Sequence, residues 1–128
     1  MINKAKNLLV ITMLCMTTSS IFAQTDLVKT INQAFTEADT KVLATILAEE
    51  VTLSLFDDEQ SMSKEETLAA VSGFFSEHPV SSFEHKHDGQ AKDGSSFAIG
   101  EILVGEETYR TYVVIIDEKI AELCIDLD

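Results

Sequence analysis

Residues 80–127, VSSFEHKHDGQAKDGSSFAIGEILVGEETYRTYVVIIDEKIAELCIDL, read as four β-strands in succession. The strands cover 81–88, 95–104, 108–116 and 120–127, and turns marked by glycine or acidic residues separate them. In the second and third strands apolar side chains occur at odd and even positions alike, so both faces of the sheet are largely apolar. Helices must then pack on one face, and the other face needs a cover, for which a partner chain is one candidate.

The residues before this stretch predict two helices. Apolar residues recur at helical spacing from Asp26 to Ala38, and Asp26 suits the start of that helix. A break at Asp39-Thr40 separates it from a second, shorter helix, in which the inward residues are Val42, Leu43, Ile46 and Leu47. We expect a structural role for Asp39 at this break.

One strand and a third helix complete the pattern. Residues 51–56 alternate as a strand does, and a polar turn is expected at 57–60. Ser63 and Glu66 form a capping box that opens the third helix, which stops before Pro79. The predicted order is therefore helix, helix, strand, helix and four strands, an α+β domain.

The N-terminal segment has the three parts of a secretory signal. Lys4 and Lys6 precede an apolar run at 8–16, and a small, polar stretch leads to a cleavage site after Ala23. The apolar run is too short to span a membrane, which needs about 20 residues. Leu14 stands before Cys15 where lipoprotein processing requires a small residue, so no lipid anchor is expected. The sequence predicts a signal peptide at 1–23, export to the periplasm, and a single mature domain at 24–128.

Charge and cysteine content limit the possible partners. The net charge is −13, and loss of the two signal lysines makes it −15. A chain this acidic repels nucleic acid and anionic membrane surfaces. Export also removes Cys15 and leaves Cys124 alone, so no intramolecular disulfide can form. A buried, inert thiol is the simplest interpretation of Cys124, and an intermolecular bridge or a reactive thiol is the alternative.

A family resemblance rests on several of these stretches. The opening, which comprises Ile31-Asn32-Gln33-Ala34-Phe35, the break at Asp39, and Val51-Thr52-Leu53, resembles the start of the nuclear transport factor 2-like (SnoaL-like) superfamily. The later half is similar to a small exported bacterial family of unknown function within it, through Ser82-Phe83, His85, Gly89, Ala98-Ile99-Gly100 and Thr108-Tyr109-Arg110-Thr111-Tyr112.

The resemblance implies a cystatin-like cone, in which a strongly bent, mainly antiparallel sheet wraps around three N-terminal helices. Such a cone often has a pocket in its mouth. Members of the superfamily include isomerases, dehydratases, epoxide hydrolases and non-catalytic binding or dimerisation modules, so the fold leaves the function open.

Two histidines are candidate site residues. In a regular strand His85 and His87 share a face about 7 Å apart, which can supply two ligands of a metal site. Nothing specifies a third ligand, although Asp88 or His78 is a candidate, and we predict no metal. The alternatives are two half-exposed histidines on the sheet rim, or a general base facing the mouth of the cone.

The run Tyr109-Arg110-Thr111-Tyr112 is the second candidate. Arg110 and Tyr112 share a face and can hold a carboxylate or phosphate group. In the alternative interpretation Arg110 lies over the sheet and pairs with an acid such as Glu101 or Glu122.

These residues lead to one preferred function and two alternatives. No catalytic motif matches the chain, and the acids at 57–59 are interpreted as solvated turn residues rather than a calcium site. We predict a non-catalytic module, without a cofactor, that binds a small anionic ligand or a protein. Its candidate ligand-binding residues are Arg110, Tyr112, Tyr109, His85 and His87. The alternatives are a lyase or isomerase with His85 or His87 as base and Tyr109 or Tyr112 as proton donor, and a structural homodimer that pairs through the outer sheet face.

Overall fold

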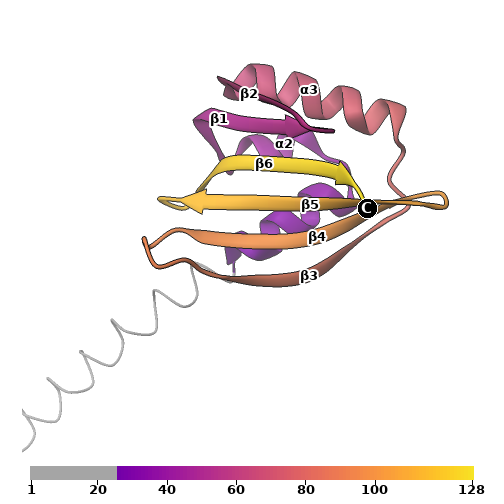
Figure 1. Cartoon of the computed structure of the whole chain (residues 1–128). Coiled ribbons are helices and arrows are strands. Elements are labelled where there is room, and N and C mark those ends of the chain that lie inside the picture. The colour runs from indigo at the N-terminus through magenta and orange to yellow at the C-terminus, as the bar shows by residue number, and fades with distance from the viewer. Residues whose placement is uncertain (1–25) are drawn as a thin grey trace, which may run out of the picture.

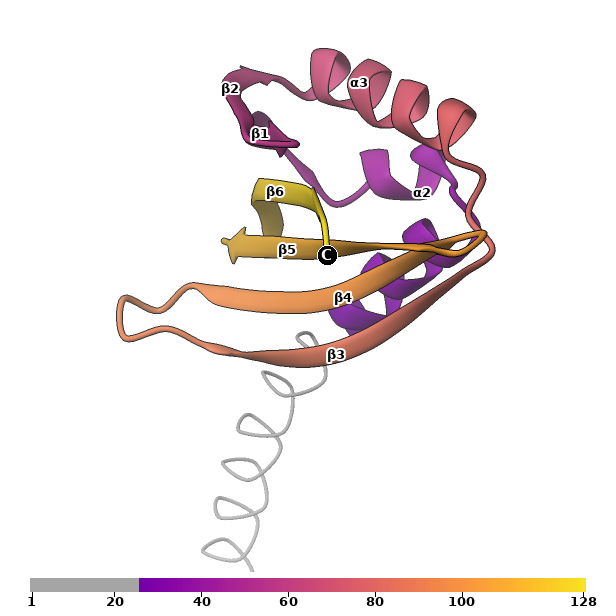
Figure 2. The ribbon, with the colours of Figure 1, turned by 45° about the vertical axis from the view of Figure 1, so that its right-hand side comes forward.

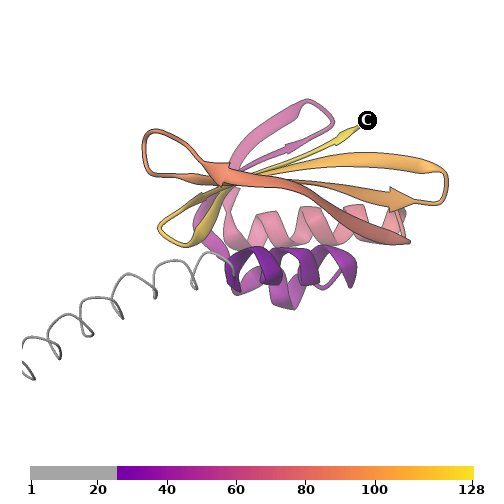
Figure 3. The same cartoon turned by 90° about the horizontal axis from the view of Figure 1, so that it is seen from below.

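The computed structural model describes residues 26–128, so the predicted signal peptide at 1–23 lies outside the described residues. A six-stranded sheet forms one layer, and the helices form a second layer on one of its faces (Figure 1, Figure 3). The described residues begin with a helix over 26–36. The later elements are α2 (Thr40–Ala44), β1 (Leu47–Leu55), β2 (Asp58–Ser63), α3 (Lys64–Glu77), β3 (Ser82–Gln90), β4 (Ser96–Val104), β5 (Glu107–Ile116) and β6 (Lys119–Leu127).

The sheet has the order β2-β1-β6-β5-β4-β3. All neighbouring strands are antiparallel except β1 and β6, which run parallel. Figure 2 shows the sheet bending around the helices, with β1 and β2 turned away from the plane of β3 and β4. The predicted bent, mainly antiparallel sheet on N-terminal helices is confirmed.

One strand was not predicted. Residues 58–63 form β2, although the sequence indicated a polar turn at 57–60. The real turn is Phe56-Asp57, and both residues have positive φ, 53° and 70°. Such a two-residue hairpin turn usually contains glycine or asparagine, and this one contains neither. The helix α2 is also shorter than predicted, because β1 already begins at Leu47.

The predicted cap of α3 is present. The Ser63 Oγ atom accepts a hydrogen bond from the Glu66 backbone N–H at 3.2 Å and fixes the start of α3. The Asp39 carboxylate accepts from the Lys41 N–H at 2.9 Å at the start of α2, which is the structural role expected for it. The side chain of Asp39 therefore caps a helix of only five residues.

Aromatic rings fill the space between the helix over 26–36 and the sheet. Phe83 of β3 stacks on Phe35 at 5.3 Å between ring centroids, and Phe75 of α3 meets Phe35 edge-on at 6.2 Å. The ring of Phe83 lies over Gly100 of β4, where an added Cβ atom would come within 2.3 Å of the Phe83 ring. Gly100 therefore provides the room that Phe83 occupies.

A second aromatic cluster lies where α3 ends. Its members are Phe56, Phe74, His78 and Tyr109, with ring centroids 4.5–6.1 Å apart. Tyr109 is only 4 % exposed, and its hydroxyl donates a hydrogen bond to the Glu107 carboxylate at 2.9 Å. Burial first, and then this carboxylate, raise the pKa of the Tyr109 phenol above its ordinary value of 10.0.

A glycine pair tests the packing of Phe83. We expect Gly100→Ala to lower the free energy of unfolding by about 1–3 kcal/mol, because the new methyl group overlaps the Phe83 ring. Gly73, in the middle of α3, has no atom within 4 Å of an added Cβ, so Gly73→Ala should raise the free energy of unfolding by about 0.5–1 kcal/mol. Urea unfolding followed by circular dichroism measures the free energy of unfolding of both variants. Equal changes of the same sign would contradict the close contact between Phe83 and Gly100.

The chain has two tyrosines, so Tyr112→Phe leaves Tyr109 as the sole phenol. We expect absorbance at 295 nm to show ionisation of Tyr109 above pH 10 in the folded protein and near pH 10 in urea. The folded-state pKa is the higher one, so the contribution to stability is present below the unfolded pKa and is lost as the pH rises through the folded pKa. Identical midpoints in buffer and in urea would disprove the burial of this hydroxyl.

Candidate functional site

A β-bulge in β3 separates the two candidate histidines. His85 lies opposite Gly100 of β4, whereas His87 lies opposite Ile99. Because Gly100 and Ile99 are consecutive, and opposed residues share a face, His85 and His87 lie on opposite faces of the sheet. The prediction that the two histidines share a face is therefore wrong. The bulge, which shifts the register between them, is the physical reason.

Each histidine has its own partners. The His85 Nε2 atom lies 3.2 Å from the Asp88 carboxylate. The ring of His87 lies against Phe97, 5.7 Å between ring centroids, on the side of the sheet away from the helices. Between residues 26 and 128 no three His, Cys, Asp or Glu side chains come together as metal ligands.

Arg110 and Tyr112 do share the face of the sheet that is turned away from the helices, which we call the outer face. There the Arg110 Nη2 atom lies 3.6 Å from the Asp128 carboxylate, so its ion pair is with the end of the chain and not with Glu101 or Glu122. Tyr112 is 39 % exposed and stacks with Phe97 at 6.2 Å. Tyr109 faces the helices instead, within the aromatic cluster. The five predicted site residues are thus divided between the two faces of the sheet.

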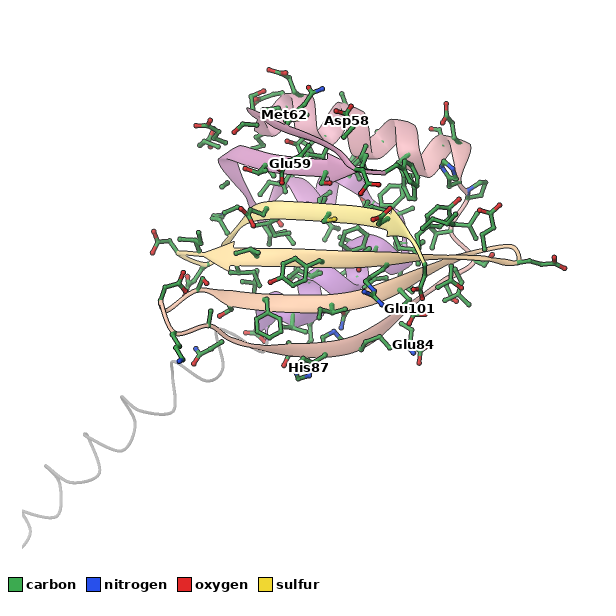
Figure 4. The ribbon with its side chains drawn as sticks, in the orientation of Figure 1. Asp58, Glu59, Met62, Glu84, His87 and Glu101 are labelled. Carbon is green, nitrogen blue, oxygen red and sulfur yellow. The ribbon has the colours of Figure 1, made fainter. Side chains whose placement is uncertain are left out.

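A charged row crosses the outer face beside these residues. Glu84 of β3 lies opposite Glu101 of β4, and Glu101 lies opposite Arg110 of β5 (Figure 4 labels the two glutamates). The Lys86 ammonium group lies 3.3 Å from Glu84 and 3.6 Å from Glu101, and these carboxylates raise its pKa, with the Glu84 hydrogen bond as the largest cause. Lys86 and Arg110 on this face therefore each have a carboxylate partner.

A hollow lies elsewhere among the described residues, between the β1–β2 hairpin and α3. This hairpin pocket has a volume of about 210 Å³ and is open to solvent. Its lining consists of Leu53, Leu55, Asp58, Gln60, Met62 and Ala70. The register of the hairpin explains why they converge: Leu53 lies opposite Gln60 and Leu55 opposite Asp58, so all four side chains project to the same face of the hairpin.

The hairpin pocket combines apolar walls with two polar groups. Leucine, methionine and alanine side chains supply the walls, Asp58 supplies a carboxylate, and Gln60 supplies an amide that can donate and accept. Figure 4 labels Asp58, Glu59 and Met62, which all belong to β2 of the hairpin. These groups suit a small apolar ligand that carries one hydrogen-bond donor. A cationic donor suits the Asp58 carboxylate best, because a charge-assisted hydrogen bond is stronger than a neutral one.

The sequence did not indicate these residues because it placed 57–60 in a turn. One signal was available: Asp58, Gln60 and Met62 alternate with Glu59 and Ser61, and exactly two residues separate Leu55 from Asp58, as in a tight hairpin.

Cys124 lies on the outer face opposite Tyr112, half-buried and with a free thiol. Among the helices of residues 26–128, none has the length and apolar character that crossing a membrane requires.

Solved structures share this architecture. A DUF4783 family protein from Bacteroides uniformis superposes with a TM-score of 0.71 at 25 % identity, over 78 % of this chain and 95 % of that one. A DUF4783 family protein from Bacteroides ovatus gives 0.70 at 24 % identity, over 77 % and 92 %. An NTF-2 like protein of unknown function from Burkholderia xenovorans gives 0.63 at 11 % identity, over 83 % of each chain, which shows a likeness of fold alone.

No curated protein matches the chain. The family described as "Domain of unknown function (DUF4783)" matches residues 28–126, which include β1 to β5 and all of β6 except Leu127. This match covers more than half of the chain, and the α+β arrangement of helices on a sheet matches that of the structural neighbours. The chain therefore belongs to the DUF4783 family and has a nuclear transport factor 2-like fold.

Proposed function

We propose that the protein is an exported, non-catalytic binding module whose hairpin pocket receives a small apolar group bearing a hydrogen-bond donor. The observation that carries the proposal is the pocket itself, about 210 Å³ in volume, with four apolar side chains and two polar ones. Ligand sites typically have this composition, although they usually measure about 300–1,000 Å³. The volume suits a single ring or a single side chain.

The aromatic packing under the sheet supports this choice. Phe75 and Phe83 both pack on Phe35 between the helices and the sheet, so rings rather than a cavity occupy that position. A ligand is therefore more easily accommodated under the hairpin, where Asp58 and Gln60 are exposed at the rim.

The positions of the titratable groups favour binding over catalysis. The histidine-base alternative requires His85 or His87 to share a cavity with a tyrosine. His85 pairs with Asp88, and His87 and Tyr112 lie on the outer face, on either side of Ile99. None of these residues lines the hairpin pocket.

Export rests on the signal pattern of residues 1–23. Amino-terminal sequencing of the protein recovered from periplasm tests cleavage after Ala23.

Benzylamine, a ring with one ammonium group, is a suitable probe of the hairpin pocket. We expect its addition to the ¹⁵N-labelled protein to shift the amide resonances of Asp58, Gln60 and Met62, with a dissociation constant on the order of 1 mM for a ligand of this size. Asp58→Asn should weaken binding about tenfold, because a charge-assisted hydrogen bond is lost. Toluene, which has no donor, should bind Asp58→Asn and the unaltered protein equally.

Glu59→Gln is the matched control, because it removes one negative charge from the neighbouring residue on the opposite face of the hairpin. It should leave the affinity for benzylamine within twofold of the unaltered protein. Ala70→Leu should fill the pocket from α3 and abolish the shifts while leaving the circular dichroism spectrum unchanged. Benzylamine shifts that persist in Ala70→Leu, or that centre on the outer face, would refute the proposed site.

A further inference from the structure

We propose that the hairpin pocket and the free edge of β2 together bind an extended, cation-rich segment of a partner protein, which adds to the sheet as a seventh strand. The segment would pair with β2 through its main chain and place one apolar side chain in the pocket. This inference rests on the proposed function, since it assigns the partner of the same pocket.

The first support is an open sheet edge. β2 is the outermost strand of the sheet, and no other segment between residues 26 and 128 pairs with its far side. Counted from the two-residue turn, Asp58, Gln60 and Met62 exchange hydrogen bonds with β1. The backbone N–H and C=O groups of Glu59 and Ser61 consequently point to the free edge, where an extended peptide can bond to them.

The two edges of the sheet differ. At the opposite edge β3 is interrupted by the bulge between His85 and His87, which disrupts the regular ladder of donors and acceptors. β2 has no bulge: its pairing with β1 runs without a shift from Glu50↔Ser63 to Leu55↔Asp58. Its first four residues are exposed. The β2 edge is therefore straight and accessible, as strand addition requires.

The pocket lies at the correct place for a side chain of the added strand. In an antiparallel arrangement, residues opposite Glu59 and Ser61 project to the same face as those two side chains. The residues between them project to the other face, beside Asp58, Gln60 and Met62, which line the pocket. A strand with alternating cationic and apolar residues thus fits both faces at once.

Charge defines the partner. Residues 49–66 contain seven acids, Glu49, Glu50, Asp57, Asp58, Glu59, Glu65 and Glu66, and one cation, Lys64, a net charge of −6. A second copy of this chain, with a net charge of −13, is repelled from such an edge, whereas a segment rich in lysine or arginine is attracted. The acids therefore disfavour pairing of this edge with a second copy of the chain and favour a cationic strand.

The test uses a blocked seven-residue peptide, lysine-valine-lysine-leucine-lysine-valine-lysine, and the ¹⁵N-labelled protein. At saturation we expect amide hydrogen exchange at Glu59 and Ser61 to slow at least about tenfold, because these N–H groups gain partners. Exchange at Gln60, whose N–H already bonds to β1, should not change. Unchanged exchange at Glu59 and Ser61 would overturn the proposal.

Two methylated peptides separate strand pairing from charge attraction. N-methylation of the lysine amides, which face β2 in the antiparallel arrangement, should abolish the protection. N-methylation of the valine and leucine amides, which face away, should preserve it. Equal binding of both peptides would show charge attraction alone and would overturn strand addition.

Protein variants distinguish this inference from the proposed function. Glu59→Gln should weaken peptide binding about threefold while leaving benzylamine binding unchanged, and Glu118→Gln, in the β5–β6 turn, should affect neither. Benzylamine binding without peptide protection would overturn the inference and leave the proposed function standing. The inference also fails if a peptide with glycine in place of leucine binds as tightly as the original peptide, because the pocket would then contribute nothing to peptide binding.

Discussion

The close contact between the Phe83 ring and Gly100 determines how the aromatic side chains pack between the sheet and the helices. A phenylalanine ring can lie flat on the neighbouring strand only because the residue beneath it has no Cβ atom. In that position Phe83 reaches Phe35, and Phe35 reaches Phe75, so three rings occupy the volume between the sheet and the helices. Protein interiors are packed at high density, so these rings leave no room for a ligand where they lie. The hairpin pocket lies outside this aromatic cluster, between the β1–β2 hairpin and α3.

A second phenylalanine ring packs over a glycine on the outer face of the sheet. An added Cβ atom at Gly89 would come within 2.9 Å of the Phe97 ring, so Phe97 lies over Gly89 much as Phe83 lies over Gly100. Phe97 in turn contacts His87 and Tyr112. The pair β3 and β4 is therefore clamped by an aromatic ring on each face, which stabilises an edge strand whose own side chains are mostly exposed.

Much of the architecture could be predicted from the sequence, because it depends on local signals. Ser63 caps α3 as expected, Asp39 has a structural role at the break between the helices, and the four later strands follow from alternation and from turns at Gly94, Gly105 and Asp117. β2 was missed because its turn uses phenylalanine and aspartate in the left-handed region, and Phe56 stays there by packing on Phe74 and Tyr109. Those contacts are tertiary, and no local pattern reveals them.

The candidate site was harder to predict for a related reason. Assigning a side chain to a face of a strand requires an uninterrupted count, and the bulge after His85 breaks it. Tyr109 was grouped with Arg110 and Tyr112 by proximity in sequence, although successive residues of a strand project to opposite faces. The residues of the hairpin pocket could not be grouped from the sequence, because their convergence depends on β2 being a strand.

The parallel pairing of β1 with β6 sets the order in which the molecule can be completed. Leu47 lies opposite Ile120, a separation of 73 residues, and the Ile120 N–H donates to the Ile46 carbonyl at 2.7 Å. β6, the last strand of the sheet to be synthesised, thus lies between the β1–β2 hairpin and the remainder of the sheet. Contacts of such long range form slowly, since the intervening loop must close first. A nascent chain that still lacks β6 cannot join the two halves of the sheet, so the sheet closes only after residues 119–127 have been synthesised.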